Sequence, residues 1–301
     1  MSRLLVFTDP AMARHDPGPG MPERSARWLA AHEAIEARRD VELRRPTPID
    51  RDALLRVHDE TYVDGLLGAA GRPFAVDPET TGSADSVEAI RLAAGATREA
   101  ALAAVDGTPA FALVRPPGHH ATHRTGMGFC FVNNVVVAAR AAQAERAIER
   151  VLIVDWDVHH GNGTEDLVKG DASLLFFSTH QGGGGFYPGT GLVSTDNAIN
   201  VPLGPGDGDA ALLDAFRERL RPAAAAFDPD LVLVSAGFDA HEADPLAGML
   251  ATADGFAALC TEVRDLADAH ADGRLALTLE GGYDLDALTA CISACVDVLT
   301  H

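Results

Sequence analysis

The sequence lacks long apolar runs and paired cysteines. None of its apolar runs reaches the roughly 18 residues that a membrane-spanning helix needs, and the N-terminal run is too short for a secretory signal. We therefore expect a cytoplasmic protein with no membrane contact. The four cysteines form no C-x-x-C pair, and Cys291 and Cys295 lie one helical turn apart in an apolar pattern. This spacing predicts buried, reduced thiols.

Positive charge is also scarce. The sequence has 24 Lys and Arg residues against 44 Asp and Glu residues, which gives a net charge of −20, and Lys169 is its single lysine. A surface of this sign repels phosphate, so we expect no nucleic-acid partner. The same surface would attract cationic small molecules or basic peptides, although solubility or a salty habitat explains the charge as well.

Apolar runs with the character of buried strands recur along the whole chain. They are Leu4–Thr8, Ala110–Val114, Val151–Val154, Leu174–Phe177, Ile199–Leu203, Leu231–Ser235 and Leu275–Leu279. Segments of helical period lie between most of them: Glu23–Arg38, Ser83–Val105, Asn133–Ala147, Asp209–Phe227, Thr252–His270 and Leu285–Leu299. This alternation predicts an α/β fold with a mostly parallel sheet that is covered on both faces. No linker divides the sequence, so we expect residues 1–301 to form a single domain.

Polar residues follow five of these strands directly. The five segments are Arg115–His120, Asp155–Asn162, Ser178–His180, Ser235–Asp239 and Glu280–Tyr283. Ligands of open α/β sheets bind outside the carboxyl ends of the strands. Five such ends with His, Asp and Tyr residues therefore predict a functional site at that edge of the sheet.

The segment after the third strand has the order D-x-D-x-H, formed by Asp155, Asp157 and His159. If the backbone stays extended, its period of two directs all three side chains to one side. Asp239 joins them from another strand end. Two carboxylates and one imidazole suit a divalent cation such as Zn²⁺, Fe²⁺ or Mn²⁺. Three protein ligands also leave room for water or substrate, which is typical of a catalytic metal site.

Two adjacent histidines, His119 and His120, follow the second strand. Each needs its own partner, and Asp155 and Asn162 are available on a neighbouring strand end. A carboxylate partner holds an imidazole cationic, whereas an amide partner fixes only its orientation. We therefore expect one histidine to act electrostatically and the other to carry the proton.

Tyr283 follows a Gly-Gly pair that permits a sharp turn. Its neutral phenol could donate a hydrogen bond to an oxyanion that forms opposite a metal. With a histidine that accepts a proton from water, this set predicts hydrolysis of an acyl compound by metal-activated water. No G-x-S-x-G nucleophile motif is present, so direct attack by water is favoured over an acyl-enzyme.

Six segments of the sequence together resemble those of a known family. The segments RPPGHHA, MGFCFVNN, VDWDVHHGNGTE, FYPGTG, SAGFDAHEADPLAGM and LEGGYDL are similar to those of the zinc-dependent histone deacetylase superfamily. The resemblance is to its bacterial class II branch, which includes histone deacetylase-like amidohydrolases and acetylpolyamine amidohydrolases. It implies the arginase/deacetylase fold, with a mostly parallel eight-stranded sheet and helices on both faces.

The resemblance also implies the bound ions. Zn²⁺, or Fe²⁺ in the cell, would be bound by Asp157, His159 and Asp239. A structural K⁺ would be bound by these residues: Asp155, Asp157, the carbonyl of His159, Ser178 and Thr179. A second cation would lie near Val168, Asp171 and Leu174.

It implies roles for further side chains as well. His119, paired with Asp155, would be the electrostatic histidine; His120, beside Asn162, would be the general base and acid. Tyr283 would polarise the substrate carbonyl. The substrate tunnel and its surroundings would comprise Gly128, Phe129, Tyr187 and Leu246, with Arg24 by an inner acetate cavity and Met21 and Asp77 at the rim.

Three features of the sequence bear on the substrate. Met21 replaces the family's usual histidine and makes the rim more apolar, and Gly182–Gly185 predicts a flexible tunnel wall. Leu246 is the residue typical of lysine-type enzymes, whereas a polyamine-selective relative has glutamate there. We therefore expect an acylated lysine peptide or protein as substrate. An acetylpolyamine or a small ester is the alternative, favoured weakly by the negative charge.

Two remote alternatives lie outside this reaction. A two-manganese ureohydrolase would need a carboxylate at position 161, where Gly161 stands. A catalytically silent acyl-lysine binding module would be expected to lack at least one catalytic residue. Every predicted catalytic and metal-binding position, including Tyr283, has the expected residue. The sequence leaves the oligomeric state open, and an oligomer is compatible with it.

Overall fold

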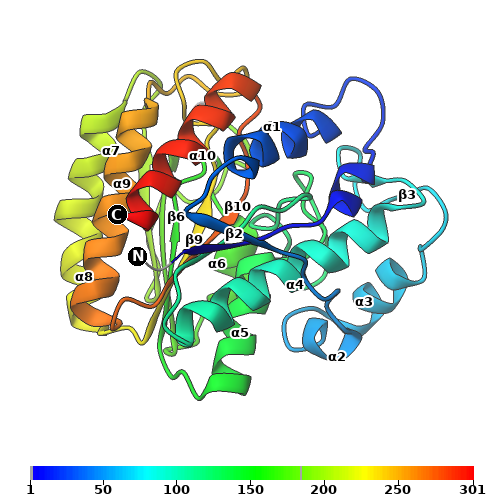
Figure 1. Ribbon diagram of the computed structural model, residues 1–301, viewed down its shortest axis with the longest axis horizontal. Helices are drawn as coiled ribbons and strands as arrows, with labels where there is room; N and C mark the ends of the chain where they lie inside the picture. The colour runs from blue at the N-terminus through cyan, green and yellow to red at the C-terminus, as the bar shows by residue number, and fades with distance from the viewer. Residues whose placement is uncertain (1–2, 184) are drawn as a thin grey trace.

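A parallel sheet forms the centre of the computed structural model, which describes residues 3–183 and 185–301 (Figure 1). Within these residues the sheet has eight strands in the order β2-β1-β5-β10-β9-β6-β7-β8. Its strands are β1 (Leu4–Phe7), β2 (Val41–Arg44), β5 (Ala110–Ala112), β6 (Val151–Asp155), β7 (Leu174–Gln181), β8 (Ala198–Leu203), β9 (Leu231–Ala236) and β10 (Leu275–Leu279). A short antiparallel pair, β3 (Phe74–Ala75) and β4 (Thr81–Gly82), lies outside it. The expected α/β class and eight-stranded parallel sheet are therefore confirmed.

Helices cover both faces of the sheet (Figure 1). The helical elements are η1 (Pro10–Arg14), α1 (Ser25–Glu36), α2 (Arg51–Leu54), α3 (Glu60–Leu67), α4 (Ser86–Val105), α5 (Asn134–Arg146), α6 (Asn162–Val168), α7 (Asp209–Ala215), η2 (Phe216–Leu220), α8 (Arg221–Phe227), α9 (Ala253–His270) and α10 (Leu285–Thr300). Helices α4 and α5 pack together on one face, and α9, α10 and α1 pack on the other. Each face of the apolar sheet is thereby removed from water, as the continuous apolar strands require.

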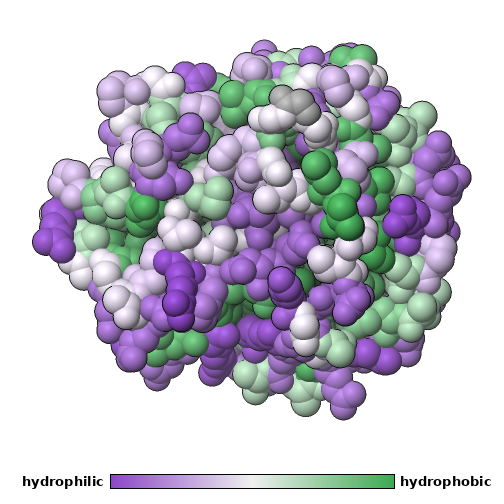
Figure 2. Space-filling view, turned by 180° about the vertical axis from the view of Figure 1, so that it is seen from behind, coloured by the Kyte–Doolittle hydropathy of each residue, from purple (hydrophilic) through white to green (hydrophobic). Residues whose placement is uncertain are grey.

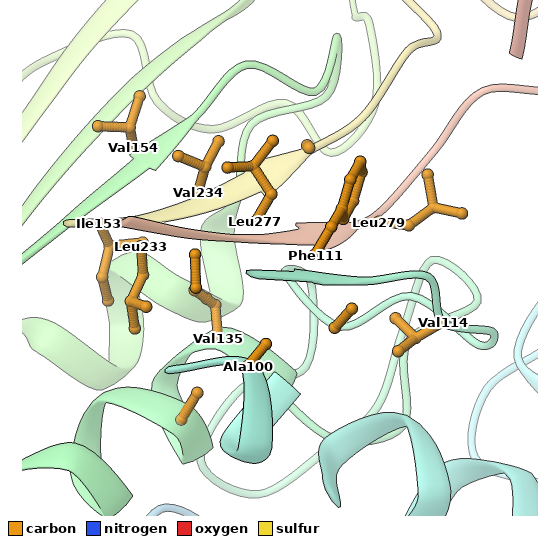
Figure 3. Packing of buried hydrophobic residues seen from close by; sticks show 14 of the residues in the cluster. Ala100, Phe111, Val114, Val135, Ile153, Val154, Leu233, Val234, Leu277 and Leu279 are labelled. Atoms are coloured by element: carbon orange, nitrogen blue, oxygen red, sulfur yellow. The ribbon is translucent and has the colours of Figure 1, made fainter. Parts of the chain in front are cut away.

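The alternation of side chains along neighbouring strands builds the two halves of the core. Ile153 of β6 pairs in register with Leu233 of β9, and Val154 pairs with Val234. Figure 3 shows Ile153 and Leu233 on the side of the sheet where Val135 of α5 lies, and Val154 and Val234 on the other side. All are buried, and complete burial of such a side chain contributes about 1.5–3 kcal/mol.

Several elements differ from the sequence prediction, which also left out the short elements η1, α2, α3, β3, β4 and α6. Strand β2, Val41–Arg44, was missed because two of its four residues are charged and its position is at the sheet edge. The helix expected over Asp209–Phe227 is divided by a π-helical turn, Phe216–Leu220, just before Pro222, which has no N–H to continue the helical hydrogen bonds. Strand β7 continues to Gln181, so Ser178–His180 lie within the strand and not after it.

The surface is polar over most of the face seen from behind (Figure 2). Figure 2 shows a face that is largely hydrophilic, with apolar side chains in separate patches. Of the helices in the described part of the chain, none combines the length and the apolar character needed to cross a lipid bilayer.

Candidate active site and metal centre

The strand order explains why the predicted residues meet. Strands β5, β10, β9, β6 and β7 are consecutive neighbours in the sheet, and all run parallel. Their carboxyl ends therefore share one edge, although they are far apart in the sequence. The five predicted polar segments lie at the carboxyl ends of these five strands, either in the last residues of a strand or shortly after it.

Three of the predicted ligands converge closely. The Nδ1 atom of His159 lies 3.1 Å from Oδ1 of Asp157 and 3.1 Å from Oδ2 of Asp239. One ligand atom from each residue lies within 4.8 Å of those of the other two, and all three residues are almost fully buried. Burial works against a charged imidazole, but the hydrogen bonds to both carboxylates raise the pKa of His159 to about 10. The two carboxylates thus favour positive charge between them, and this donor set fits a divalent cation.

Backbone amides hold these carboxylates in place. The N–H groups of His159 and Gly281 donate to the two oxygens of Asp157, at 2.9 and 2.8 Å. The N–H of Val158 donates to Oδ1 of Asp239 at 2.8 Å. A Cβ at Gly281 would lie only 2.1 Å from Oδ2 of Asp239, so the close approach of this loop requires glycine.

The two adjacent histidines have the separate partners that the sequence suggested. Nδ1 of His119 lies 2.9 Å from Oδ2 of Asp155, and Nδ1 of His120 lies 2.7 Å from Oδ1 of Asn162. Burial disfavours charge on both rings. At His119 the carboxylates of Asp157 and Asp155 outweigh burial and raise its pKa well above 6.5. Burial, with repulsion from His119 and His159, lowers the pKa of His120 well below 6.5. One imidazole is therefore cationic and the other neutral.

The tyrosine at the end of β10 is also buried at the site. Burial raises the pKa of Tyr283 well above 10, so its phenol is a neutral hydrogen-bond donor. The guanidinium carbon of Arg27 lies 4.8 Å from the centre of the Tyr283 ring. Arg27 also donates to the carbonyls of Gly282 and Glu280, each at 2.6 Å. This arginine fixes both the loop and the ring, but the sequence prediction missed it.

A pocket of about 490 Å³ leads to these groups. Its lining includes His120, His159 and Tyr283 at the chemical end, together with the predicted residues Met21, Gly128, Phe129, Tyr187 and Leu246. Its lining also includes Phe186, which was not predicted although it precedes Tyr187 in the FYPGTG segment. The Phe186 ring stacks on the imidazole of His159, with centres 5.1 Å apart and planes 8° apart.

The turn that carries Phe129 is held in an unusual conformation. Phe129 has φ 68°, a left-handed value that a bulky side chain adopts only under constraint. Backbone hydrogen bonds between Met127 and Cys130, and a bond from the Phe129 N–H to Oγ1 of Thr80, supply that constraint. The aromatic ring is thereby presented to the pocket.

Two predicted residues lie outside the pocket lining. Arg24 is exposed at the start of α1 and does not line the pocket; the arginine buried against Tyr283 is Arg27, one helical turn later. Asp77 is not part of the pocket lining, and its Oδ1 accepts hydrogen bonds from the N–H groups of Glu79 and Thr80. Burial, with a contribution from the Asp77 charge, raises the pKa of Tyr187, which does line the pocket, and the place of Asp77 at the rim stays a prediction. Glu79 is the acidic residue at the pocket. Gly184, in the predicted flexible wall, lies outside the described residues.

A second group of possible ligands, His119, Cys130 and Glu280, lies behind the site. Glu280 accepts hydrogen bonds from the N–H groups of Gly118 and His119 and from the hydroxyl of Ser235. Burial raises the pKa of the Cys130 thiol well above 9. This group is part of the support of the His119 loop.

The residues predicted for a structural K⁺ lie together at the ends of two paired strands. Asp155 of β6 pairs in register with Ser178 of β7, and Thr179 follows. Oδ1 of Asp155 accepts from the N–H of Asp157, and the Ser178 hydroxyl lies 2.9 Å from Nδ1 of His180. Among the described residues, the buried Thr179 hydroxyl has no hydrogen-bond partner. Such an orphaned oxygen is compatible with a bound cation nearby.

Comparison with known proteins agrees with this fold and site. The histone deacetylase domain family matches residues 19–299. The chain therefore belongs to the histone deacetylase family, and it is a hydrolase of the deacetylase type.

Two relatives and one solved structure are similar to this chain over most of their length. A histone deacetylase-like amidohydrolase of Pseudomonas aeruginosa is 38% identical over 302 residues, which cover 97% of this chain and 78% of that protein. Histone deacetylase 10, chloroplastic, of Oryza sativa is 37% identical, with 97% of this chain and 72% of that protein covered. The crystal structure of the HDA15 HD domain has a TM-score of 0.93 and 36% identity, with coverage of 99% and 88%.

Proposed function

We propose that the protein is a metal-dependent amidohydrolase that removes acetyl or longer acyl groups from lysine side chains. One observation carries the proposal: Asp157, His159 and Asp239 converge at the end of a pocket that His120 and Tyr283 also line. A metal ligand set, a neutral base and a neutral donor at one point are the parts that amide hydrolysis by water requires.

Asp157, His159 and Asp239 would hold the ion. When bound, a divalent ion such as Zn²⁺ lowers the pKa of water and polarises a carbonyl. The chain's own groups supply the proton transfers. Because Nδ1–H of His120 donates to Asn162, its Nε2 carries the free lone pair that can accept a proton from water. The same nitrogen can then protonate the departing amine.

His119 and Tyr283 act on charge rather than on protons. The cationic His119, held by Asp155, stabilises negative charge that develops beside His120. The Tyr283 hydroxyl, neutral and buried, donates a hydrogen bond to the oxyanion of the tetrahedral intermediate. Ser178 and Thr179, with the Asp155 loop, would hold a structural K⁺, as the orphaned Thr179 hydroxyl suggests.

The pocket walls support an acyl-lysine as substrate. Phe129, Tyr187 and Leu246 present apolar surface that suits the methylene chain of lysine. Glu79 at the same pocket favours a substrate with a nearby positive charge. An acetylpolyamine is the second candidate, because it combines the same amide with additional cationic amines.

A substrate panel tests the proposal. Acetate release from acetyl-lysine peptides and from acetylspermidine is measured for the wild type and for His120→Ala, which lacks the base but retains the three metal ligands. We expect turnover of the peptide to exceed that of the polyamine, and His120→Ala to be slower by about 10²–10⁴-fold. Absence of acetate from every acylated amine would contradict the proposal, and preferential turnover of acetylspermidine would select the second candidate.

A further inference from the structure

A side-chain amide occupies a cage of three backbone carbonyls at the far end of the sheet from the pocket. The Nδ2 atom of Asn197, which directly precedes β8, lies 2.5 Å from the carbonyl oxygen of Val168. The same nitrogen lies 3.1 Å from the carbonyl of Asp171 and 3.2 Å from that of Leu174. Val168 ends α6 and Leu174 begins β7, so one side chain joins three elements.

The hydrogen bonds fix which way the amide points. The N–H of Gly170 donates to Oδ1 of Asn197 at 3.4 Å. If the amide were turned over, its oxygen would face three carbonyl oxygens at hydrogen-bond distance and repel them, so the NH₂ group must face the cage.

The cage oxygens have capacity left for a further partner. The Val168 carbonyl already accepts from the N–H of Asp171, and the Asp171 carbonyl accepts from the N–H of Leu174. Each oxygen has a second lone pair. The Asp171 carboxylate cannot contribute, because it is engaged by Ser173 and by Arg140. The site therefore offers neutral oxygens that converge on one point.

Neutral carbonyl oxygens around a point are the ligands that proteins use for K⁺. The resemblance stated above places a second cation among these same three residues. The cage has no room for that cation, because Nδ2 of Asn197 occupies the point where the three carbonyl oxygens converge.

We propose that the Asn197 amide replaces a monovalent cation and closes the junction of α6, β7 and β8 from within the chain. The two N–H hydrogens of the amide are shared among the three carbonyls and add no charge. Removal of this amide would free one lone pair on each of the three oxygens and convert the cage into a cation site. An ion would have access, because Asn197, Leu174 and Gly170 also line a surface pocket of about 360 Å³.

The test is thermal unfolding of Asn197→Ala at constant ionic strength in KCl, LiCl or tetramethylammonium chloride. In tetramethylammonium chloride we expect Tm to fall by about 2–6 °C relative to the wild type, because a partly buried hydrogen-bonded group is lost. In KCl most of that loss in Tm should be recovered. The wild type can also respond to KCl, through the predicted K⁺ residues near the active site, so the rise in Tm of the variant must exceed that of the wild type.

Asn200→Ala is the matched control. Asn200 lies in β8, and its amide also donates two hydrogen bonds, to Glu165 and to the carbonyl of Val193, but it fills no carbonyl cage. Its Tm should fall without any additional recovery in KCl. If Asn197→Ala responds to K⁺ no more than the wild type and Asn200→Ala do, the proposal is wrong.

A second measurement uses the wild-type protein, so it does not depend on whether a variant folds. Anomalous diffraction from wild-type crystals soaked in RbCl should show no Rb⁺ peak among the carbonyls of Val168, Asp171 and Leu174. A peak at that point would show that an ion displaces the amide and would overturn the proposal. Neither measurement requires deacetylase activity, so both are independent of the proposed function.

Discussion

Two clusters of buried charged residues contact the loop that ends in Tyr283. They differ in the ratio of negative to positive groups. In the first, Glu23 is paired with Arg115, at 2.5 and 2.8 Å, and with Arg27 at 3.2 Å. In the second, the three carboxylates of Asp155, Asp157 and Asp239 face only two imidazoles, those of His119 and His159. The first cluster satisfies its acid with its own cations, whereas the second has more negative than positive groups.

The pKa values express this difference. Burial favours the neutral form of Glu23, but Arg115 and His15 overcome it and hold the pKa of this carboxyl far below 4.5. Burial and repulsion from Asp157 raise the pKa of Asp239 instead. The first cluster can serve as rigid support, because its one carboxylate is held by two buried guanidinium groups. A cluster with excess negative charge is suited to bind a metal cation.

The largest expected effect is on stability, from Glu23→Gln. Loss of this carboxylate leaves Arg115 and Arg27 buried without a counter-charge, which should lower the free energy of unfolding at pH 7 by about 3–5 kcal/mol. Because the folded pKa of Glu23 lies below the unfolded value of 4.5, its contribution is complete above that value. It is lost as the pH falls from there toward the folded pKa.

Urea unfolding between pH 7 and pH 3 measures this effect. The wild type should lose stability more steeply than Glu23→Gln as the pH falls below 4.5. Parallel curves for the two proteins would show that the Glu23 cluster is not the paired support described here.

Tyr283→Phe should have the next largest effect, on the reaction itself. Loss of one oxyanion donor costs about 10²–10³-fold in kcat, while the three metal ligands remain. Steady-state kinetics and metal analysis of the variant measure both. The matched control is Tyr62→Phe, whose hydroxyl donates to the carbonyl of Phe131 outside the pocket lining. It should retain wild-type kcat, and an equal loss in both variants would contradict the role of Tyr283.

The smallest effect is expected for an exposed ion pair. Arg38 hydrogen-bonds Asp40 at 2.6 and 3.0 Å and lowers the pKa of that carboxyl to about 2. Asp40 is nevertheless open to solvent, where such pairs contribute little. Asp40→Asn should therefore leave the urea midpoint nearly unchanged. A loss of stability as large as that of Glu23→Gln would show that burial does not explain the difference between this exposed ion pair and the Glu23 cluster.

The fold could be predicted where apolar pattern dominates. The core strands are short, continuous apolar runs, and their alternation with helices indicated a parallel sheet before any contact was known. Val41–Arg44 could not be recognised, because an edge strand is held by backbone pairing to β1 and needs little apolar sequence. The π-helical turn before Pro222 likewise depends on packing that periodicity does not encode.

The site could be predicted where residues are contiguous in the sequence. His119, His120 and the D-x-D-x-H segment were found because strand ends gather polar residues, and the structure brings them together with Asp239. Arg27 was missed, and Arg24 chosen in its place, because only the course of α1 shows which arginine faces the core. Asn197 could not be found, since its partners are backbone carbonyls that leave no mark in the sequence.

The central claim is that the second cluster needs one divalent cation for amide hydrolysis. The most direct measurement is metal content by mass spectrometry, combined with acetyl-lysine hydrolysis, for the wild type before chelation, after chelation and after addition of Zn²⁺, and for Asp239→Asn. We predict one divalent ion per chain in the wild type, loss of both this ion and activity on chelation, and recovery of both with Zn²⁺. The Asp239→Asn variant should have neither the divalent ion nor activity. Undiminished hydrolysis by the chelated protein, or a full complement of metal in Asp239→Asn, would contradict the account.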